Sequence, residues 1–148
     1  MHSAKKESAM ADQIFDRSHA VYVKHVPCKG RGLFANVPFK IGDVIDRAPT
    51  WEFDTKTAIL FRRTGLFQYY FVRDDLGEKA ALVAGYVVFG FISIVNHSSN
   101  PNAQTIWSDG DAGASATIVA IRDIKVGEEI THRYKNISEY PSTIKFVE

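Results

Sequence analysis

The stretch that decides the fold prediction is residues 96–102, which reads Asn-His-Ser-Ser-Asn-Pro-Asn. It follows directly on Ala80–Val95, a run of 16 residues without a charge. Apolar runs normally end in simple turn residues, but this one ends in two side chains able to bind a ligand, in a segment that Pro101 makes rigid. The run is shorter than the roughly 20 residues that cross a bilayer. Two glycines and a serine also interrupt it, so we expect a buried core segment.

Two further motifs flank this stretch. Residues 29–35 read Lys-Gly-Arg-Gly-Leu-Phe-Ala, and residues 126–134 read Val-Gly-Glu-Glu-Ile-Thr-His-Arg-Tyr. A lone Gly-x-Gly is usually a turn or bulge. This one is neither a dinucleotide fingerprint nor a P-loop, because no third glycine opens a helix and no Gly-Lys-Ser/Thr ending follows. All three motifs in this order within 148 residues are hard to produce by chance.

The composition indicates a single domain with an adequate core, since 45% of the residues are hydrophobic and 12% aromatic. A net charge of +1 gives no sign of a nucleic-acid footprint or a membrane-seeking surface, so we expect neither partner. Cys28 is the only cysteine, which rules out an internal disulfide and a cysteine-rich zinc cluster. The five histidines show no ligand spacing, so no metal site is predicted.

Residues 1–18 are polar and lack an apolar stretch, so we expect a mobile leader and no signal peptide. The predicted setting is intracellular and cytoplasmic, with secretion into a host as the alternative.

From Ala20 onward, short β-type runs alternate with Gly, Pro and Asp, which predicts a mostly β domain with little helix. The best helix candidate is 55–63, with Asp54 as its cap and Gly65 as its stop. Strands are predicted at 20–25, 31–35, 43–48, 67–72, 80–84, 103–107 and 115–121.

Residues 35–45 and 120–130 resemble each other, because each contains a Lys-apolar-Gly-acid sequence between two strands. This sequence is a good turn recipe. We interpret the pair as two similar hairpin corners within one β-fold, the second leading into a new strand near Glu129.

Together the three motifs resemble the SET domain, the fold of protein-lysine methyltransferases. Residues 30–35 match the first motif of that family, 90–102 its Asn-His motif, and 127–134 its last motif, which ends in the catalytic tyrosine. The resemblance implies a β-clip-like SET domain of short strands in several small sheets. It also implies a C-terminal pseudoknot, in which the last two segments cross beside the cofactor.

The predicted organisation is a leader at 1–18 and one SET domain at 19–148. Its tail, 136–148, lacks the zinc-binding cysteines of many members. The pattern is more similar to the small stand-alone SET proteins of bacteria and viruses.

The resemblance implies a protein-lysine N-methyltransferase that takes methyl groups from S-adenosylmethionine and leaves S-adenosylhomocysteine. The implied partner is a protein or peptide with a target lysine, with histone-like proteins among the candidates, and a homodimer is one way to complete the substrate groove. One alternative is a SET-fold binding module that holds cofactor or peptide without turnover. A second is a structural or assembly β-domain that binds no S-adenosylmethionine.

The resemblance assigns roles to particular residues. Tyr134 is the catalytic residue, and Asn96 and His97 contact the cofactor, His97 mostly through its backbone. The complete set of implied cofactor-binding residues is Lys29, Gly30, Arg31, Gly32, Leu33, Asn96, His97 and Tyr134. The implied substrate channel contains Tyr70, Phe91 and His132.

Several of these assignments rest on a choice between neighbours. Alternation in a strand puts Tyr69 and Tyr70 on opposite faces, and we favour Tyr70 for the channel. By the same rule adjacent Glu128 and Glu129 point apart, so a turn and a solvated face are favoured over paired acid/base carboxylates.

Four departures from the family pattern bear on substrate choice and on the number of methyl groups added. His132 stands where the family has Tyr, Phe or another residue, and we expect it at the channel wall. In the alternative, His132 points outward to solvent and its neighbour Arg133 points into the protein. The departures are Ser93, Ser99, His132 and Arg133.

Overall fold

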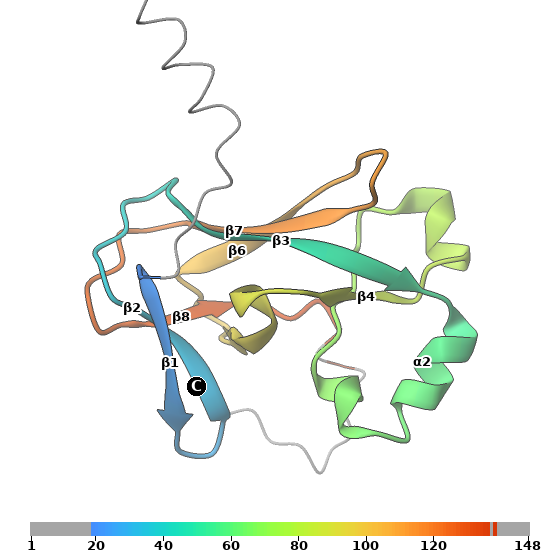
Figure 1. Cartoon of the computed structure of the whole chain (residues 1–148), viewed down its shortest axis with the longest axis horizontal. Coiled ribbons are helices and arrows are strands. Elements are labelled where there is room, and N and C mark those ends of the chain that lie inside the picture. Colours follow the sequence, from blue (N-terminus) through green and yellow to red (C-terminus); the bar gives the residue numbers. More distant parts are fainter. Residues whose placement is uncertain (1–18, 137, 139–148) are drawn as a thin grey trace, which may run out of the picture.

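Short strands in two sheets make up most of the regular secondary structure in this computed structural model, which describes residues 19–136 and residue 138 (Figure 1). The predicted leader and all of the predicted tail except residues 136 and 138 lie outside these described residues. The elements in chain order are β1 (Val21–Val26), β2 (Gly30–Ala35), β3 (Val44–Phe53), α2 (Thr55–Phe61), η1 (Gly65–Gln68), η2 (Gly77–Ala81), β4 (Gly85–Val88), η3 (Phe91–Ile94), β5 (Asn96–His97), β6 (Ala103–Ser108), β7 (Ser115–Ala120) and β8 (Glu129–His132), where η marks a 3-10 helix.

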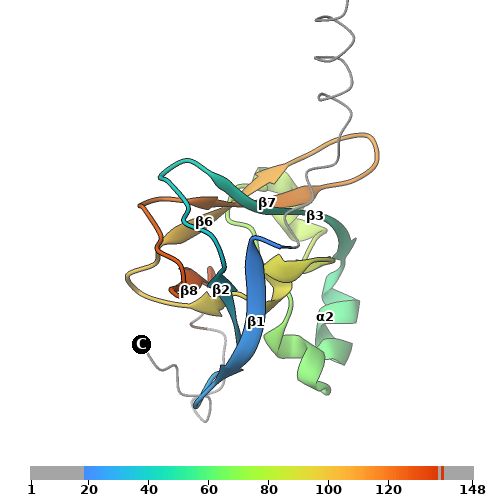
Figure 2. The ribbon, with the colours of Figure 1, turned by 60° about the vertical axis from the view of Figure 1, so that its left-hand side comes forward.

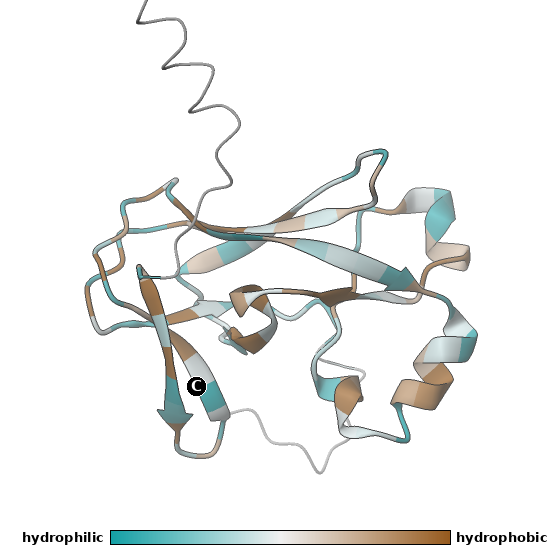
Figure 3. Ribbon diagram, viewed as in Figure 1, coloured by the Kyte–Doolittle hydropathy of each residue, from teal (hydrophilic) through white to brown (hydrophobic). Residues whose placement is uncertain are grey.

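The strands form two four-stranded sheets, ordered β1-β2-β8-β5 and β4-β3-β7-β6. Figure 2 shows the two sheets from a second side. The main core lies between them, and it takes buried side chains such as Leu33 and Ile130 from one sheet and Ile45 and Ile118 from the other. The apolar segments η3 and β4 run through the middle of this space (Figure 3). Within the uncharged run 80–95, Tyr86, Val88, Ile92 and Val95 are buried, whereas residues 80–82 and Phe89 are exposed, so only part of the run is an interior segment. No helix within the described ranges is long and apolar enough to cross a membrane.

Most predicted elements are confirmed. The strands predicted at 20–25, 31–35, 43–48, 103–107 and 115–121 are present, and β3 extends further, to Phe53. The predicted helix is present as α2, where the Asp54 side chain accepts a hydrogen bond from the Thr57 N–H at 2.9 Å. The helix ends at Phe61, two residues before the predicted end.

Two predicted strands are wrong. Residues 67–72 contain the end of η1 and a single bridge between Phe71 and Tyr86, and 80–84 lie in and after η2. The aromatic residues of the first segment suggested a strand, but Phe67 and Tyr70 pack instead in a second, smaller core with Phe53 and Ala58, whereas Phe71 packs against the main core. Here the demands of packing against α2 override local strand preference.

The two similar corners are present and bond to each other. Gly42 and Gly127 both adopt positive φ, at 90° and 87°. The Gly42 N–H donates to the carbonyl of Ala120, which ends the strand before the second corner, and the Gly127 N–H donates to the carbonyl of Ala35, which ends the strand before the first. This reciprocal pairing places β8 alongside β2.

A buried arginine joins the segment between β3 and β4 to the β6–β7 hairpin. The Arg73 side chain is only 3% exposed, and it forms ion pairs of 2.8 Å with both Asp75 and Asp109. Its guanidinium also lies over the rings of Trp107 and Tyr86, at 5.2 and 5.6 Å from the ring centroids. The hydrogen bonds from Arg73 lower the pKa of the Asp75 and Asp109 carboxyls.

This arrangement predicts a loss of stability in acid. A carboxyl group whose pKa is lowered by folding contributes stability that is complete above its unfolded pKa, about 3.9, and is lost as the pH falls through the folded value. We expect Asp109→Asn to make the free energy of unfolding less dependent on pH below about 4, as measured by urea denaturation at several pH values. Asp111→Asn is the matched control, because Asp111 forms no ion pair with any described residue. Equal pH dependence in the two variants would contradict the assignment.

Candidate active site

Strands β5 and β8 bring the second and third motifs side by side. They pair in parallel, with Asn96 opposite Thr131 and His97 opposite His132. On its other edge β8 pairs with β2, which carries the glycine motif, with Leu33 opposite Ile130. Three segments that are far apart in the sequence therefore meet around one short strand. The chain crossing that the family resemblance implies stays a prediction.

Asn102 holds β8 in place at this junction, a role that no sequence pattern indicated. Its side chain is almost fully buried. Its Nδ2 donates to the Glu129 carbonyl at 2.8 Å, and its Oδ1 accepts from the Thr131 N–H at 2.9 Å. An amide that satisfies both backbone groups fixes the position of β8 relative to the turn that follows β5.

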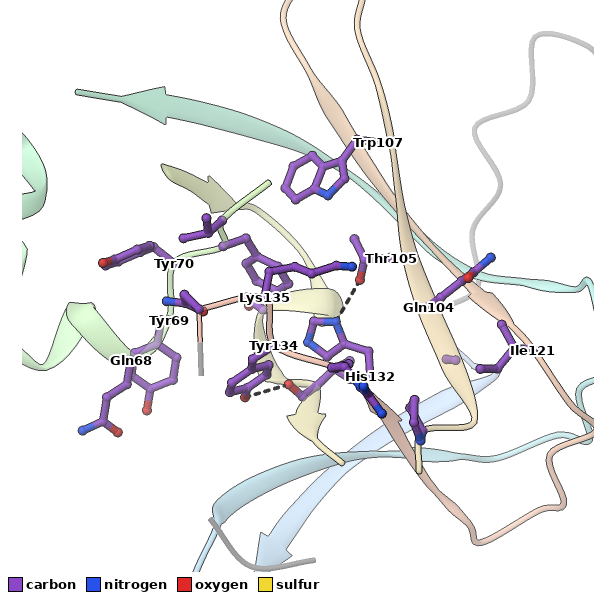
Figure 4. A pocket seen from close by; sticks show the side chains of 18 residues that line it. Gln68, Tyr69, Tyr70, Gln104, Thr105, Trp107, Ile121, His132, Tyr134 and Lys135 are labelled. Atoms are coloured by element: carbon purple, nitrogen blue, oxygen red, sulfur yellow. Dashed lines mark hydrogen bonds between the residues drawn. The ribbon is translucent and has the colours of Figure 1, made fainter. Parts of the chain in front are cut away.

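Tyr134 lies directly after β8 and is held at both ends. Its backbone N–H donates to Nδ1 of His97 at 2.9 Å, and its hydroxyl donates to the Val95 carbonyl at 3.1 Å (Figure 4). Burial raises the pKa of Tyr134 to about 12, and the charge of Glu129 adds to this effect. The hydroxyl therefore keeps its proton at neutral pH. The His97 ring thus positions Tyr134, and the contact expected between the His97 backbone and the cofactor stays a prediction.

His132 and Arg133 both line the cavity, but His132 is buried whereas Arg133 is exposed. The His132 ring is almost fully buried, and its Nδ1 lies 3.0 Å from the Thr105 hydroxyl (Figure 4). Its Nε2 has no hydrogen-bond partner among the described residues. Burial lowers the pKa of His132 to about 3, with a smaller contribution from His97, so the ring is neutral at physiological pH. Arg133 is exposed and donates to the Ser99 carbonyl at 2.6 Å.

A cavity of about 240 Å³ lies beside these residues (Figure 4). Both tyrosines of the neighbouring pair reach it: Tyr69 is about half exposed, and Tyr70 is buried with its ring 5.2 Å from that of Phe53. Phe91 lies outside this cavity, because its position on η3 packs it against the main core. Other residues that line the cavity are Phe71, Thr105, His132 and Tyr134.

The glycine motif forms a close backbone approach at its second glycine. A Cβ atom on Gly32 would lie 2.6 Å from Oε1 of Glu129 and 3.1 Å from Nδ2 of Asn96. Gly30 adopts φ of 80°, and Arg31 is exposed with its carbonyl bonded to Asn96. Leu33 is fully buried, so only its backbone can face a ligand.

Glu129 belongs to this cluster, which corrects the expectation of a solvated side chain. Its side chain is 19% exposed, its Oε1 accepts from Nδ2 of Asn96 at 2.7 Å, and its Oε2 lies 3.8 Å from Nζ of Lys29. Glu128 takes the predicted turn role and accepts from the Lys125 N–H. Because adjacent residues in an extended chain point to opposite sides, a turn role for Glu128 places Glu129 on the side that faces Gly32 and Asn96.

The described residues contain no group of three or more His, Cys, Asp or Glu side chains that could hold a metal ion. The site residues provide a neutral tyrosine (Tyr134), a neutral histidine (His132), an amide (Asn96) and a loosely paired carboxylate (Glu129). Such a set can bind and orient a charged ligand.

Comparison with known proteins agrees with this geometry. The sequence model of the SET domain matches residues 30–135. A zebrafish (Danio rerio) protein named N-lysine methyltransferase KMT5A-A is 29% identical over 124 residues, which is 79% of this chain and 36% of the relative. The Drosophila melanogaster histone-lysine N-methyltransferase Set8 is 27% identical over 84% of this chain and 19% of its own length. The chain therefore spans about a third and a fifth of these curated relatives.

A solved structure shares the fold. The Neurospora SET domain protein DIM-5, a histone lysine methyltransferase, superimposes with a TM-score of 0.60 at 22% identity, over 86% of this chain and 55% of that one. At this level of identity the likeness concerns the fold alone.

Proposed function

We propose that this chain, which belongs to the SET domain family, is a protein-lysine N-methyltransferase. The observation that carries the proposal is the position of Tyr134. It is held by His97 and Val95 at the junction of the motif strands, and it lines the cavity beside His132. The names of the two curated relatives support the same reaction class.

The residues around Gly32 fit S-adenosylmethionine as the methyl donor. Asn96, Lys29 and Glu129 supply polar groups for an amino-acid end, and the missing Cβ at Gly32 lets the Glu129 and Asn96 side chains lie directly against β2. When bound, this cofactor supplies a methyl group on a positively charged sulfur. We assign its binding to Lys29–Leu33, Asn96, His97 and Tyr134.

The residues of the chain then have to position a lysine amine in its neutral form. Deprotonating a lysine of pKa about 10.4 at neutral pH costs roughly 4–5 kcal/mol. A partly buried cavity lowers this cost, because desolvation disfavours the charged ammonium. The cavity wall includes the aromatic rings of Tyr69, Tyr70 and Tyr134, whose faces stabilise cationic groups. Holding two reactants as neighbours supplies a further large part of the rate.

Neither buried titratable group in the cavity is suited to act as a base. The pKa of Tyr134 is raised to about 12 and that of His132 is lowered to about 3, so neither changes charge near neutrality. The role that we assign to Tyr134 is therefore orientation, through a hydroxyl that remains protonated.

The direct test is transfer of a tritiated methyl group from S-adenosylmethionine to a lysine-rich protein mixture. We expect the tritium label to remain on the protein after the free cofactor has been washed away. The alternative of a binding module without turnover predicts cofactor binding by calorimetry with no label in protein.

We place the reaction in an intracellular setting, with a histone-like protein as the substrate class and a homodimer as the arrangement that completes the substrate groove.

One prediction concerns the number of methyl groups added. Each added methyl needs room and removes a hydrogen-bond donor from the amine, and His132 lines the cavity that we assign to the lysine. We expect His132→Phe to shift the ratio of mono-, di- and trimethyl lysine, because it changes both the volume and the polarity of this wall, as measured by mass spectrometry of one peptide at matched turnover. Lys125→Gln, at an exposed residue that does not line the cavity, is the control and should leave the distribution unchanged. The same distribution in the His132→Phe and wild-type proteins would show that this side chain does not sense methylation state.

A further inference from the structure

The Glu129 carboxylate is set into the wall formed by β2, β5 and β8. Strand β8 provides the residue, and Gly32 of β2 and Asn96 of β5 lie against its side chain. Any residue other than glycine at position 32 would displace the Glu129 side chain, because a Cβ there would lie 2.6 Å from Oε1 of Glu129. The backbone is thus shaped around this carboxylate.

The hydrogen bonds of Asn96 define which of its atoms is available to a ligand. Its Nδ2 donates both hydrogens, one to the Arg31 carbonyl at 2.9 Å and one to Oε1 of Glu129 at 2.7 Å. Its Oδ1 accepts no hydrogen bond from any described residue. With the amide oriented by two acceptors, the remaining oxygen is a fixed acceptor beside a carboxylate.

Lys29 is close to Glu129 without being tightly bound to it. The distance of 3.8 Å between Nζ and Oε2 exceeds the 2.7–2.9 Å or so of a charge-assisted hydrogen bond. Both side chains are largely shielded from solvent, at 13% and 19% exposed. The cluster therefore presents a cation and an anion that have not satisfied each other.

A loosely paired cation and anion beside a fixed hydrogen-bond acceptor complement a zwitterion. We propose that Glu129, together with Oδ1 of Asn96, binds the α-ammonium group of the cofactor, and that Lys29 binds its α-carboxylate. This inference rests on the proposed use of S-adenosylmethionine, and it adds Glu129 as the residue that selects a ligand with a free amino group.

The test measures binding and needs no turnover. Calorimetry compares S-adenosylhomocysteine with its analogue that lacks the α-amino group, in the wild-type protein and in Glu129→Gln. We expect the wild type to prefer the natural ligand, and Glu129→Gln to lose about 10-fold or more of that affinity, as for a hydrogen bond to a charged group. The affinity for the deaminated analogue should stay within about twofold of wild type, since the missing contact is absent already.

Controls separate this role from a structural one. Glu128→Gln makes the same change one residue away, at the corner, and should leave both affinities unchanged. Lys29→Met should instead weaken ligands that carry the carboxylate, and spare an analogue without it. Equal weakening of both ligands by Glu129→Gln, or no weakening of either, would overturn the inference. A wild-type protein that binds neither ligand would overturn the proposed function with it.

Discussion

Replacing Tyr134 by phenylalanine will leave a folded protein that binds cofactor but transfers methyl groups about 100-fold more slowly, or worse, as expected for the loss of one preorganised polar group. The ring keeps its packing, at 5.3 Å from the His97 ring and 5.2 Å from the His132 ring. The backbone bond to His97 is also unaffected. Only the hydroxyl, with its bond to the Val95 carbonyl, is removed.

The measurement is single-turnover methyl transfer, with calorimetry on the same preparation to show that cofactor binding is retained. Tyr22→Phe is a suitable control, since Tyr22 lies on β1 and stacks on Phe34, away from the cavity. Turnover at the wild-type rate in Tyr134→Phe would refute the catalytic assignment.

The second large effect is expected at Asn96. Asn96→Ala removes a side chain that we assign to a charged ligand, which should weaken cofactor binding by roughly 1.5–3 kcal/mol. That is about 10- to 150-fold in affinity. It also removes the donor that holds Oε1 of Glu129, so the carboxylate is no longer fixed.

Calorimetry with S-adenosylhomocysteine checks this expectation, after circular dichroism shows that the variant is folded. Asn100→Ala, in the turn that follows, is the matched control because its side chain makes no hydrogen bond to any described residue. Affinity unchanged by Asn96→Ala in a folded protein would remove Asn96 from the cofactor site.

The three motifs and the two corners were predictable because their residue types stand out in the sequence. Gly42 and Gly127 adopt positive φ, which favours glycine, so the cause lies in the local backbone. Gly32 has to be glycine because a Cβ there would meet Glu129 and Asn96, which are distant in the sequence. That reason, and the short strand at Asn96–His97, come from the tertiary fold.

The segment between β3 and β4 was not predictable in the same way. Its aromatic residues alternate as in a strand, yet Tyr70 packs edge-on against Phe53 across the second core, at 5.2 Å. The buried position of Arg73 depends on Asp109, 36 residues away, and on the face of Trp107. Contacts of this kind depend on the tertiary fold, and no local sequence pattern predicts them.

The site shows the same division. Residues 130 to 132 are all buried, so strand alternation alone does not decide the direction of His132. Its bond to Thr105 and its low pKa follow from burial beside a neighbouring strand. Phe91 packs against the main core from η3 and does not line this cavity, so its predicted place in the substrate channel stays a prediction. Glu129 required knowledge that β2 and β5 flank β8.

The central claim is methyl transfer to lysine, and mass spectrometry tests it most directly. Histones and a whole-cell extract are incubated with S-adenosylmethionine carrying a deuterated methyl group, with either the wild-type protein or Tyr134→Phe. We predict deuterated methyl groups on lysine ε-amines in the wild-type reaction and a loss of about 100-fold with Tyr134→Phe. Label absent from lysine, or equal with both proteins, would contradict the account.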